Sequence, residues 1–591
     1  MDSTTNSWWR DDEALWTSGA WSIARRGDEL AEIRHDGRML VRAVRAAVRD
    51  HGWLTVPASV DSVESAADTL ILTLRHEGLG ARISSRLTVT AAAHRLTIDW
   101  DATNHTDLVT CRVGLVTLHP AASAGSGLTV VHPDDSVDAT RFPTAISPHQ
   151  PIRDIRELRI DGGTGIRFEG DVFEMEDQRN WTDASFKTYS RPLDLPYPYR
   201  LPADERVHQT ITITVDAAEH SPDGPPPAPA ASVIDLREQG AFPQIGVEAS
   251  TAPAPVAPSR LGDFRVVELD LTTPTWAAAL ARAGDDGIPL DVRLITDGTA
   301  APLREAARAM SGSEVVRLTA FDSVLHVSDG PTVAALRAAI AGTGVDAAIL
   351  AGARSHFTEL NREQQRIPRD VDGIAVTTTP LFHTADTEQL IEALPMQRLI
   401  ARQSVDIAAG PPVHIGPVAL QPRFNNVATS PEPSPTRADL SEGYGAQFTG
   451  ADDARQRADG LATWLVASAA ALAVPGVATI SWFETSGARG LAGTPAEHAM
   501  TALLGLGAHD AALLTGDSPD GLIWAIGSRS EGADAVLAAN VGRQTRRFSV
   551  RVHGSRSRDS GGADAGVGVT TIDVELAGGE WTLLTGTGAA D

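Results

Sequence analysis

Two glutamates and one histidine follow apolar runs of the kind that form buried strands. Glu484 comes directly after "VATISWF", Glu359 lies in "HFTELNRE" after the run "DAAILAGARS", and His383 lies in "TTTPLFHTAD". A carboxylate or an imidazole can take a proton from water and return one to a leaving group. We therefore predict Glu484 as a general base, with Glu359 or His383 as the acid or the orienting partner.

Arginine and asparagine side chains follow the same runs. Asn361 and Arg362 stand in "HFTELNRE", Arg423 and Asn425 stand in "LQPRFNN", and Arg489 stands in "SWFETSGARG". Guanidinium groups bind oxygen-rich ligands and stabilise a developing oxyanion. We expect these five side chains to bind the substrate.

A separate stretch, "FEMEDQRNWTDASFKTY" from Phe173 to Tyr189, gathers many hydrogen-bonding groups and few aliphatic ones. Apolar and acidic residues alternate in "FEME", so one face of a strand can pack while the other stays polar. We predict that this stretch docks against a second domain, with Arg179 and Asn180 satisfying strand ends or reaching the pocket. A purely structural network between domains is the alternative.

The candidate catalytic residues lie in a region where short apolar runs alternate with Ala- and Leu-rich helical stretches. "DFRVVELDL" and "DGIAVTTTP" are such runs, and "TWAAALARAG" is such a helix. About eight repeats over roughly 250 residues are typical of a closed (β/α)8 barrel. An open doubly wound sheet is the alternative, but no Gly-rich phosphate loop follows any run. We predict a TIM-like barrel over residues 236–507, which would gather the strand ends on one face.

The flanking regions show strand patterns instead. "RLTVTAAAHRLTIDWDATN" alternates apolar and polar residues with a period of two, which predicts an N-terminal β-sandwich over residues 1–216. A Pro-rich linker over 217–235 follows, and short strands such as "RRFSVRVHG" predict a small C-terminal β-sandwich over 508–591. The expected fold class is a multidomain α/β plus all-β chain.

Composition narrows the range of partners and locations. The 591-residue chain has a formal net charge of −26, which argues against binding to nucleic acid or to an anionic membrane surface. The single cysteine, Cys111, rules out an intramolecular disulfide. The beginning of the chain lacks a basic region followed by an apolar run, so we expect a cytoplasmic protein. The oligomeric state is left open.

Known catalytic motifs do not decide the chemistry. The sequence has no His-Glu-x-x-His, no Gly-x-Ser-x-Gly and no P-loop, so we predict neither a metal nor a cofactor. Paired glutamates can also cleave glycosidic bonds. In the largest group of barrel glycosidases they follow strands four and seven, whereas Glu359 and Glu484 follow strands five and eight. That count holds only if "FPQIGVEAS" is the first barrel strand.

Several of these segments together resemble the D-apionate lactonase family: "EMEDQRNWTDASFKTY", "TELNR", "TPLFHTAD", "IGPVALQPRFN" and "SWFETSGARG". The resemblance covers about residues 15 to 585 and implies an N-terminal β domain, a central barrel and a C-terminal β domain. Two departures are a longer Pro-rich insert near residue 225 and Ala488, where an aromatic residue is expected.

The resemblance implies hydrolysis of D-apionolactone, a small carbohydrate-derived substrate, in bacterial apiose breakdown. Lactone opening needs an activated water, stabilisation of the tetrahedral oxyanion and a proton for the leaving alkoxide. A glycoside hydrolase that uses Glu359 and Glu484 is the second hypothesis. A carbohydrate-binding protein without catalytic activity is the third.

Overall fold

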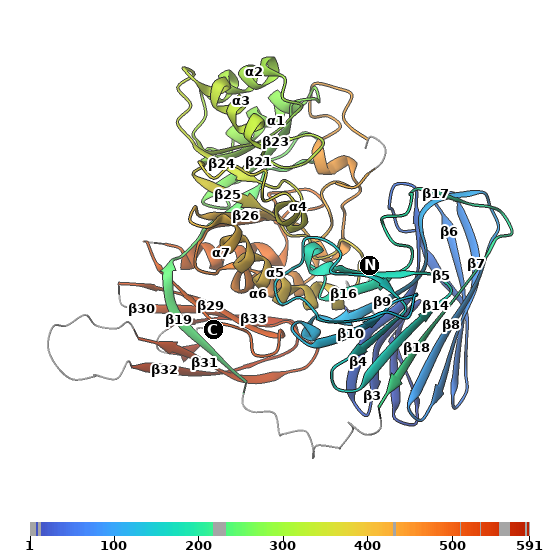
Figure 1. Cartoon of the computed structure of the whole chain (residues 1–591). Coiled ribbons are helices and arrows are strands. Elements are labelled where there is room, and N and C mark those ends of the chain that lie inside the picture. The colour runs from blue at the N-terminus through green and yellow to red at the C-terminus, as the bar shows by residue number, and fades with distance from the viewer. Residues whose placement is uncertain are drawn as a thin grey trace, which may run out of the picture.

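The computed structural model describes residues 8–9, 13–216, 232–428, 433–508, 510–531, 533–554 and 568–585, and the backbone of 588–589. Figure 1 shows an N-terminal pair of sheets, a central barrel and a C-terminal sheet. Most of the expected Pro-rich linker, residues 217–231, lies outside the described residues. No helix in the described part of the chain is long and apolar enough to cross a membrane.

The N-terminal domain is built from two nine-stranded antiparallel sheets. The inner sheet, which faces the barrel, runs in the order β1 (Glu13–Ser18), β2 (Trp21–Arg26), β3 (Glu29–His35), β4 (Arg38–Asp50), β9 (Leu108–Pro120), β16 (Ser185–Tyr189), β15 (Phe173–Asp177) and β12 (Ile152–Ile155), with β17 (Tyr199–Leu201) also paired to β9. The outer sheet runs in the order β11 (Val137–Arg141), β10 (Gly127–Val131), β13 (Glu157–Ile160), β14 (Thr164–Glu169), β18 (Arg206–Val215), β8 (Arg95–Asn104), β7 (Ala81–Ala92), β6 (Thr69–Gly78) and β5 (Ala58–Ser65).

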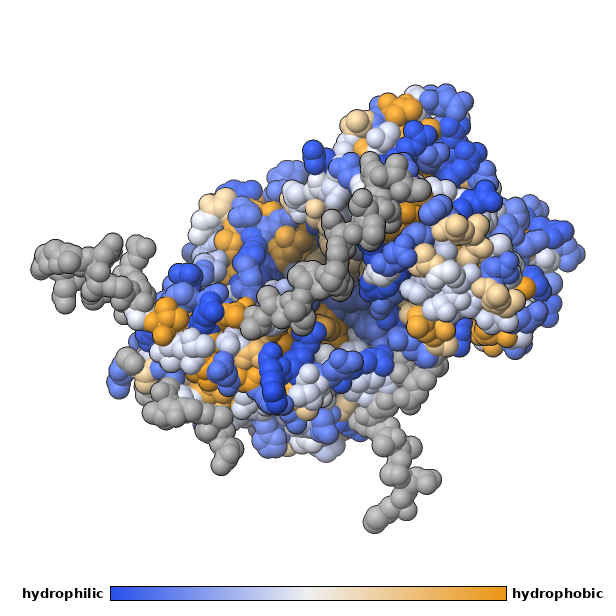
Figure 2. All heavy atoms as spheres, turned by 90° about the horizontal axis from the view of Figure 1, so that it is seen from below, coloured by the Kyte–Doolittle hydropathy of each residue, from blue (hydrophilic) through white to orange (hydrophobic). Residues whose placement is uncertain are grey.

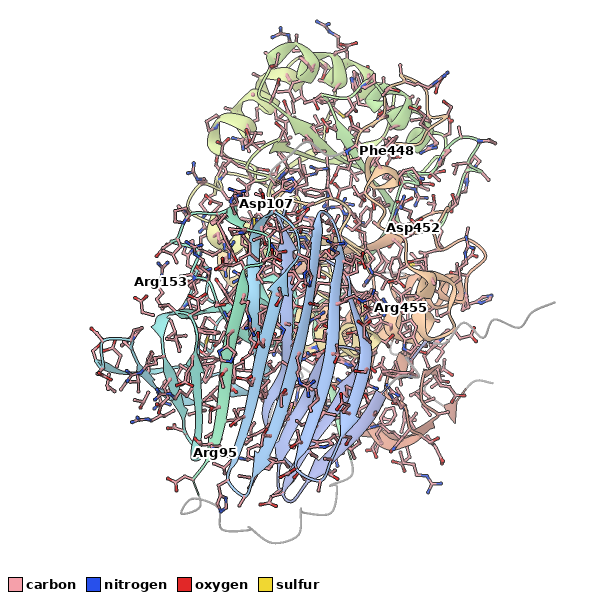
Figure 3. All side chains as sticks on the ribbon, turned by 90° about the vertical axis from the view of Figure 1, so that its right-hand side faces the viewer. Arg95, Asp107, Arg153, Phe448, Asp452 and Arg455 are labelled. Atoms are coloured by element: carbon pink, nitrogen blue, oxygen red, sulfur yellow. The ribbon has the colours of Figure 1, made fainter. Side chains whose placement is uncertain are left out.

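Buried apolar residues alternate with more exposed residues along the strands, and this alternation makes the domain a sandwich. On β7 the side chains of Ile83, Leu87 and Val89 enter the core between the sheets, because successive side chains of a strand point to opposite faces. Figure 3 looks onto the outer sheet, with Arg95 at the start of β8 and Asp107 beyond its end. The predicted β-sandwich is confirmed.

The central domain is a closed barrel of eight parallel strands. They are β20 (Gln244–Glu248), β21 (Phe264–Asp270), β22 (Leu290–Thr296), β23 (Val315–Asp322), β24 (Ala348–Gly352), β25 (Gly373–Val376), β26 (Val413–Val418) and β27 (Val477–Glu484). The helices that follow them, starting after β21, are α1 (Trp276–Gly284), α2 (Ala300–Met310), α3 (Gly330–Ile340), α4 (Phe357–Arg362), α5 (Thr387–Ala408), α6 (Gly460–Leu472) and α7 (Pro495–Leu506). The barrel is therefore confirmed over the open sheet.

The first barrel strand, β20, is the run "FPQIGVEAS". Glu484 therefore ends the eighth strand and Glu359 follows the fifth, as the full count of the runs predicts. No helix separates β20 from β21 in the described chain. The loop between β26 and α6 is instead long and carries two 3-10 helices, η3 (Gly445–Phe448) and η4 (Ala454–Arg457).

The C-terminal domain is one eight-stranded sheet that bends around its own core. Its order is β32 (Val569–Leu576), β31 (Arg546–His553), β19 (Ser232–Ala241), β28 (Ala512–Thr515), β29 (Ile523–Ser530), β30 (Ala533–Asn540), β33 (Glu580–Thr585) and β34 (Gly588–Ala589). Strand β19 pairs with β31 and β28, so residues expected in the linker and at the start of the barrel belong to this sheet.

Helix α6 joins the barrel to the C-terminal sheet. All of its residues are buried, and its sequence is apolar on every side, as expected of a helix enclosed by other elements. Trp464 of this helix shares one core with Trp524 and Leu537 of the C-terminal sheet.

Figure 2 views the surface of the molecule from below and shows a hollow near the middle of the face that it presents.

The polar stretch of the N-terminal domain forms β15, the 3-10 helix η2 (Gln178–Trp181) and β16. Arg179 lies in η2 with 2% exposure and makes a two-pronged contact with Asp177, through Nε at 2.8 Å and Nη2 at 2.7 Å. Its remaining hydrogen bonds go to the carbonyl oxygens of Pro143, Thr144 and Ala145. Every hydrogen bond of this guanidinium group stays inside the N-terminal domain, so Arg179 stabilises the fold of the stretch.

Arg179→Ala should destabilise the N-terminal domain, because it leaves the buried Asp177 carboxylate and three carbonyl groups without their donor. Breaking a buried ion pair costs about 3–5 kcal/mol. Urea unfolding followed by tryptophan fluorescence measures the change. Arg75→Ala, which removes an exposed arginine paired with Asp61, is the control and should leave the midpoint unchanged. Equal midpoints for the two variants would contradict a structural role for Arg179.

Candidate functional site

Three glutamates stand at the carboxyl ends of three adjacent barrel strands. Strand β20 lies between β27 and β21, and Glu248 at its end pairs in register with Glu484 of β27. Glu268 lies near the end of β21. Three arginines, Arg354, Arg423 and Arg489, contact these carboxylates. We call these six residues the barrel-mouth cluster.

Glu484 is held on all sides. Its side chain is 1% exposed, and Oε1 accepts hydrogen bonds from the Thr251 hydroxyl at 2.8 Å and from Arg489 Nε at 2.7 Å. Oε2 accepts from the Thr251 backbone N–H at 2.8 Å. Both carboxylate oxygens are thus engaged, and Glu484 fixes the position of the arginine beside it.

Arg489 connects this carboxylate to the long loop between β26 and α6. Its Nη1 donates to Asp452 at 2.8 Å and its Nη2 donates to the Thr251 hydroxyl at 2.7 Å. Figure 3 labels Phe448, Asp452 and Arg455 along this loop. Glu484 and Arg489, which the sequence predicted separately as site residues, are therefore in direct contact, and the loop is anchored to Arg489.

Glu248 has a different environment from Glu484. It is 4% exposed, and its Oε1 accepts one hydrogen bond, from Arg423 Nη1 at 3.2 Å. Among the described residues no donor contacts its Oε2. Burial raises the pKa of Glu248 to about 7, with the negative charges of Glu484 and Glu268 adding to the rise and Arg423 opposing it. A carboxylate with this pKa suits general-base catalysis near neutral pH.

Glu268 is held ionised by two arginines. Arg354 donates to its Oε1 from Nε at 2.9 Å and from Nη2 at 2.6 Å, and Arg423 donates to its Oε2 at 3.1 Å. Burial opposes ionisation, but the two guanidinium groups outweigh it and lower the pKa of Glu268 to about 2. Between about pH 2 and pH 7, Glu268 is therefore ionised while the neighbouring Glu248 is protonated.

Two histidines lie beside the cluster. Burial, with the positive charge of Arg354, lowers the pKa of His326 to about 4, and burial with Arg423 lowers that of His356 to about 3. Both rings are therefore neutral at physiological pH. The buried Nδ1 of His356 has no hydrogen-bond partner in the described structure, which leaves it able to meet a ligand or a water.

Glu359, one of the predicted catalytic residues, lies in the first turn of helix α4 and caps its start. Its Oε2 accepts from the backbone N–H of His356 at 3.1 Å and from the Ser355 hydroxyl, and its Oε1 accepts from Asn426. Burial raises its pKa. Within the described chain, no hydrogen bond or ion pair joins Glu359 to Glu484.

Asn361 and Asn180 lie at the interface between the N-terminal domain and the barrel, which they hold together. Asn361 Nδ2 donates to Asn180 Oδ1 at 2.9 Å and to the carbonyl oxygen of Ile146 at 3.0 Å. Gln403 of α5 donates to the same carbonyl at 3.0 Å and accepts from the Ile146 N–H at 2.8 Å. Figure 1 shows this part of the inner sheet, near β16, close to α4 and α5. The predicted docking of the polar stretch is confirmed.

Arg362 and Asn425 also reach across to the N-terminal domain. Arg362 donates to the carbonyl oxygen of Pro148 at 2.7 Å and lies 3.7 Å from Glu176. Asn425 donates to the carbonyl oxygen of Gly52 at 3.2 Å. Of the predicted substrate-binding residues, Arg423 and Arg489 therefore belong to the barrel-mouth cluster, whereas these two contact the other domain.

His383 lies at the interface, in contact with the polar stretch. Its Nδ1 is 2.6 Å from Asp183 Oδ2 and 3.3 Å from Gln178 Nε2. Burial lowers the pKa of His383, although Asp183 opposes the shift. Trp181 stacks on Phe382 with centroids 4.5 Å apart, and both rings contact His383 and His356.

The reading of strand ends missed Glu248, Glu268 and Arg354, and it assigned no role to His356. The signal for two of them was present, because "QIGVE" and "VVELD" end barrel strands in the same way as "SWFE". Within the described residues, no group of three or more His, Cys, Asp or Glu side chains is arranged to hold a metal ion.

Comparison with known proteins assigns the chain to a family. The model of the D-apionate lactonase N-terminal domain matches residues 2–218, and the model of the D-apionate lactonase TIM barrel domain matches residues 249–511. The chain belongs to the D-apionate lactonase family. A D-apionate lactonase from Brucella anthropi is 30% identical over 448 residues, which cover 69% of this chain and 73% of the relative. The resemblance seen in the sequence is thus confirmed.

Solved structures give weaker likenesses. A β-arabinopyranosidase is 10% identical with a TM-score of 0.27, covering 97% of this chain and 100% of its own. A GH30 endoxylanase from Clostridium papyrosolvens C71 is 8% identical with a TM-score of 0.36, covering 61% of this chain and 100% of its own. At these scores the likenesses carry no argument about activity.

The raised pKa of Glu248 predicts a pH-dependent effect of Glu248→Gln on stability. The folded protein holds this proton up to about pH 7, whereas a glutamate in the unfolded chain releases it near 4.5, so the wild type loses stability as pH rises between these values. Gln does not titrate. The variant should melt close to the wild type at pH 5 and above it at pH 8.

Thermal melts at pH 5, 6, 7 and 8 measure this difference. Glu575→Gln, which removes an exposed carboxylate of the C-terminal sheet, is the control and should show no such trend. A Glu248→Gln variant that is destabilised equally at every pH would contradict the raised pKa.

Proposed function

We propose that this chain is a lactone hydrolase that opens D-apionolactone to D-apionate at the barrel mouth. Family membership and the Brucella relative support the reaction. The observation that carries the location is Glu248, a buried carboxylate with a pKa of about 7 at hydrogen-bond distance from Arg423. Enzymes place acid–base groups of this kind at the carboxyl ends of barrel strands.

In the proposed reaction, Glu248 takes a proton from a water molecule, and the water oxygen attacks the carbonyl carbon of the lactone. The carbonyl π electrons move to oxygen, and the resulting oxyanion is stabilised by Arg423. When the tetrahedral intermediate collapses, the ring C–O bond breaks, and the leaving alkoxide takes the proton held by Glu248. The carboxylic acid then loses its own proton to solvent, which leaves the aldonate.

Glu484 acts in this scheme through its neighbours. It holds Arg489 and Thr251 in place and has no carboxylate oxygen free to contact water. Its charge also helps to raise the pKa of Glu248. The base that the sequence assigned to Glu484 is therefore better placed one strand away, on Glu248.

The glycoside hydrolase hypothesis has less support. Glu359 caps the first turn of the helix that follows strand five, and Glu484, at the end of strand eight, is fully hydrogen-bonded. A retaining glycosidase would instead need two carboxylates facing one bond about 5 Å apart. A carbohydrate-binding protein without catalytic activity would have no need for a glutamate with the raised pKa of Glu248. A cytoplasmic location and a small carbohydrate-derived substrate remain our predictions.

Glu248→Gln tests the base directly. It preserves the shape of the side chain and removes the proton acceptor, so kcat should fall by about 10²–10⁴-fold, the usual contribution of a positioned acid or base. In the wild type kcat/KM should rise with pH to a plateau above about 7, since only ionised Glu248 accepts a proton. Proton release from D-apionolactone, corrected for spontaneous hydrolysis, measures both effects. Glu77→Gln, an exposed change on the outer sheet, is the control.

Glu484→Gln should lower kcat by about 10²-fold, because it loosens Arg489, yet the pH dependence should survive. Removing the negative charge of Glu484 lowers the pKa of Glu248, so the rising limb of kcat/KM should move to lower pH. The pH–rate profile of the variant checks this. If kcat/KM of Glu484→Gln no longer rises with pH while kcat/KM of Glu248→Gln still does, Glu484 is the base.

A further inference from the structure

A partly open cavity lies away from the barrel-mouth cluster, between the inner sheet and the barrel. This interdomain cavity has a volume of about 60 Å³, room for a few water molecules or the charged end of a small acid. Strands β4, β9 and β16 form one wall, and His383, Thr384 and Gln389 form part of the other. It contains none of the six residues of the cluster.

Positive charge dominates the lining of the cavity. Five cationic side chains line it, against two carboxylates, Glu29 and Asp183. The cationic residues are Arg42, Arg45, Arg49, Arg112 and Lys187. This concentration is unusual in a chain with a net charge of −26, where positive groups are the minority.

Three of these cations have acidic partners. Arg42 pairs with Glu29 at 2.8 Å and with Glu392 at 2.7 Å. Lys187 pairs with Glu176 at 2.6 Å. Arg45 has a looser contact with Asp28, at 3.5 Å. The positive charge that remains uncompensated comes from the other two arginines.

Arg49 and Arg112 face each other on neighbouring strands. They are paired in register across β4 and β9, so their side chains leave the same face of the sheet at directly opposite positions. No carboxylate among the described residues lies within ion-pair distance of either. Arg49 donates only to neutral oxygens, those of Trp53 at 3.2 Å and of the Thr55 hydroxyl.

Arg112 is the more isolated of the two. It is 5% exposed, its guanidinium lies 3.7 Å from the centre of the Tyr189 ring, and its Nε has no hydrogen-bond acceptor in the described structure. A buried charge without a polar partner costs several kcal/mol. Burial and the charges of Arg112 and Arg45 also lower the pKa of Arg49 to about 10. Like charges in this position are unfavourable unless an anion lies between them.

Aromatic rings separate the cavity from the barrel mouth. Trp181 and Phe382 contact His383, which lines the cavity, and also His356, whose pKa responds to Arg423 of the cluster. The two sites are therefore neighbours that do not share lining residues.

We propose that the interdomain cavity is a second binding site, which takes the carboxylate end of a small polyhydroxylated acid between Arg49 and Arg112. Two opposed guanidinium groups match the two oxygens of a carboxylate. Gln178, the hydroxyls of Thr55 and Thr384, and the carboxylate of Asp183 offer partners for the hydroxyl groups of such an acid. The choice of D-apionate as this acid rests on the proposed function.

Calorimetric titration of the full chain with D-apionate tests the proposal, with inorganic phosphate as a second probe. The wild type should bind two equivalents of D-apionate, one at each site. Arg49→Gln and Arg112→Gln should each weaken the cavity site at least tenfold, and Arg49→Lys should retain part of the affinity. Arg75→Gln, which removes the same charge from the exposed outer sheet, should bind as the wild type does.

Initial rates of lactone hydrolysis separate the two sites. In Arg49→Gln and Arg112→Gln they should stay within about twofold of the wild type, because the barrel-mouth cluster is intact. Unchanged D-apionate binding in both variants would overturn the proposal, and so would binding of phosphate alone. Loss of both binding and hydrolysis would make the cavity the reaction site and overturn the idea of a second site. A wild type without lactonase activity would instead refute the proposed function.

Discussion

The placement of three carboxylates on adjacent strands is the constraint on which the rest of this structure depends. Closing eight parallel strands into a barrel brings the ends of β27, β20 and β21 together, and each carries a glutamate at or near its end. Three carboxylates at that spacing are unfavourable as negative charges unless cations separate them. Arg489 pairs with Glu484, and Arg354 pairs with Glu268. Arg423 contacts both Glu268 and Glu248.

That unequal division sets the pKa values on which the proposed mechanism depends. Glu268 binds Arg354 and shares Arg423 with Glu248, so the pKa of Glu268 falls. Glu248 has only the shared Arg423 and lies beside two other carboxylates, so the pKa of Glu248 rises. Two carboxylates of the same type thus take different protonation states because of their surroundings. In the proposed mechanism, Glu268 anchors Arg423, which stabilises the oxyanion, and Glu248 moves the proton.

The N-terminal domain contributes more than cover for the barrel. Its polar stretch provides a rigid turn around Arg179, the Asn180 contact to Asn361, and the Asp183 contact to His383. The same inner sheet places Arg49 and Arg112 opposite each other beside these contacts. One surface of the sandwich therefore both fixes the interface and forms the wall of a cationic cavity.

Local sequence patterns predicted the elements well, because a period of two and the alternation of strands with helices are visible within short windows. They placed Glu484 at the end of its strand and the polar stretch at the interface. Patterns do not reveal partners that are distant in the sequence. Thr251 beside Glu484 and Asp183 beside His383 come from remote segments, and β19 joins a sheet whose other strands come after the barrel.

Glu248 illustrates the same limit. It ends a run whose membership of the barrel was uncertain from the sequence, and its pKa depends on Glu484, Glu268 and Arg423, which come from three other strands or loops. Glu359 shows the opposite error, since a carboxylate in the first turn of a helix can cap that helix as well as act on a substrate. The contacts that each carboxylate makes in the folded barrel distinguish Glu248 from Glu359.

The most direct test of the central claim is a crystal structure of the enzyme with a non-hydrolysable lactam analogue of D-apionolactone. If Glu248 is the base, the analogue should lie at the barrel mouth, with its carbonyl oxygen within hydrogen-bond distance of Arg423 and the Glu248 carboxylate beside its carbonyl carbon. An analogue bound only in the interdomain cavity, with its carbonyl against His383 and Arg49, would contradict it.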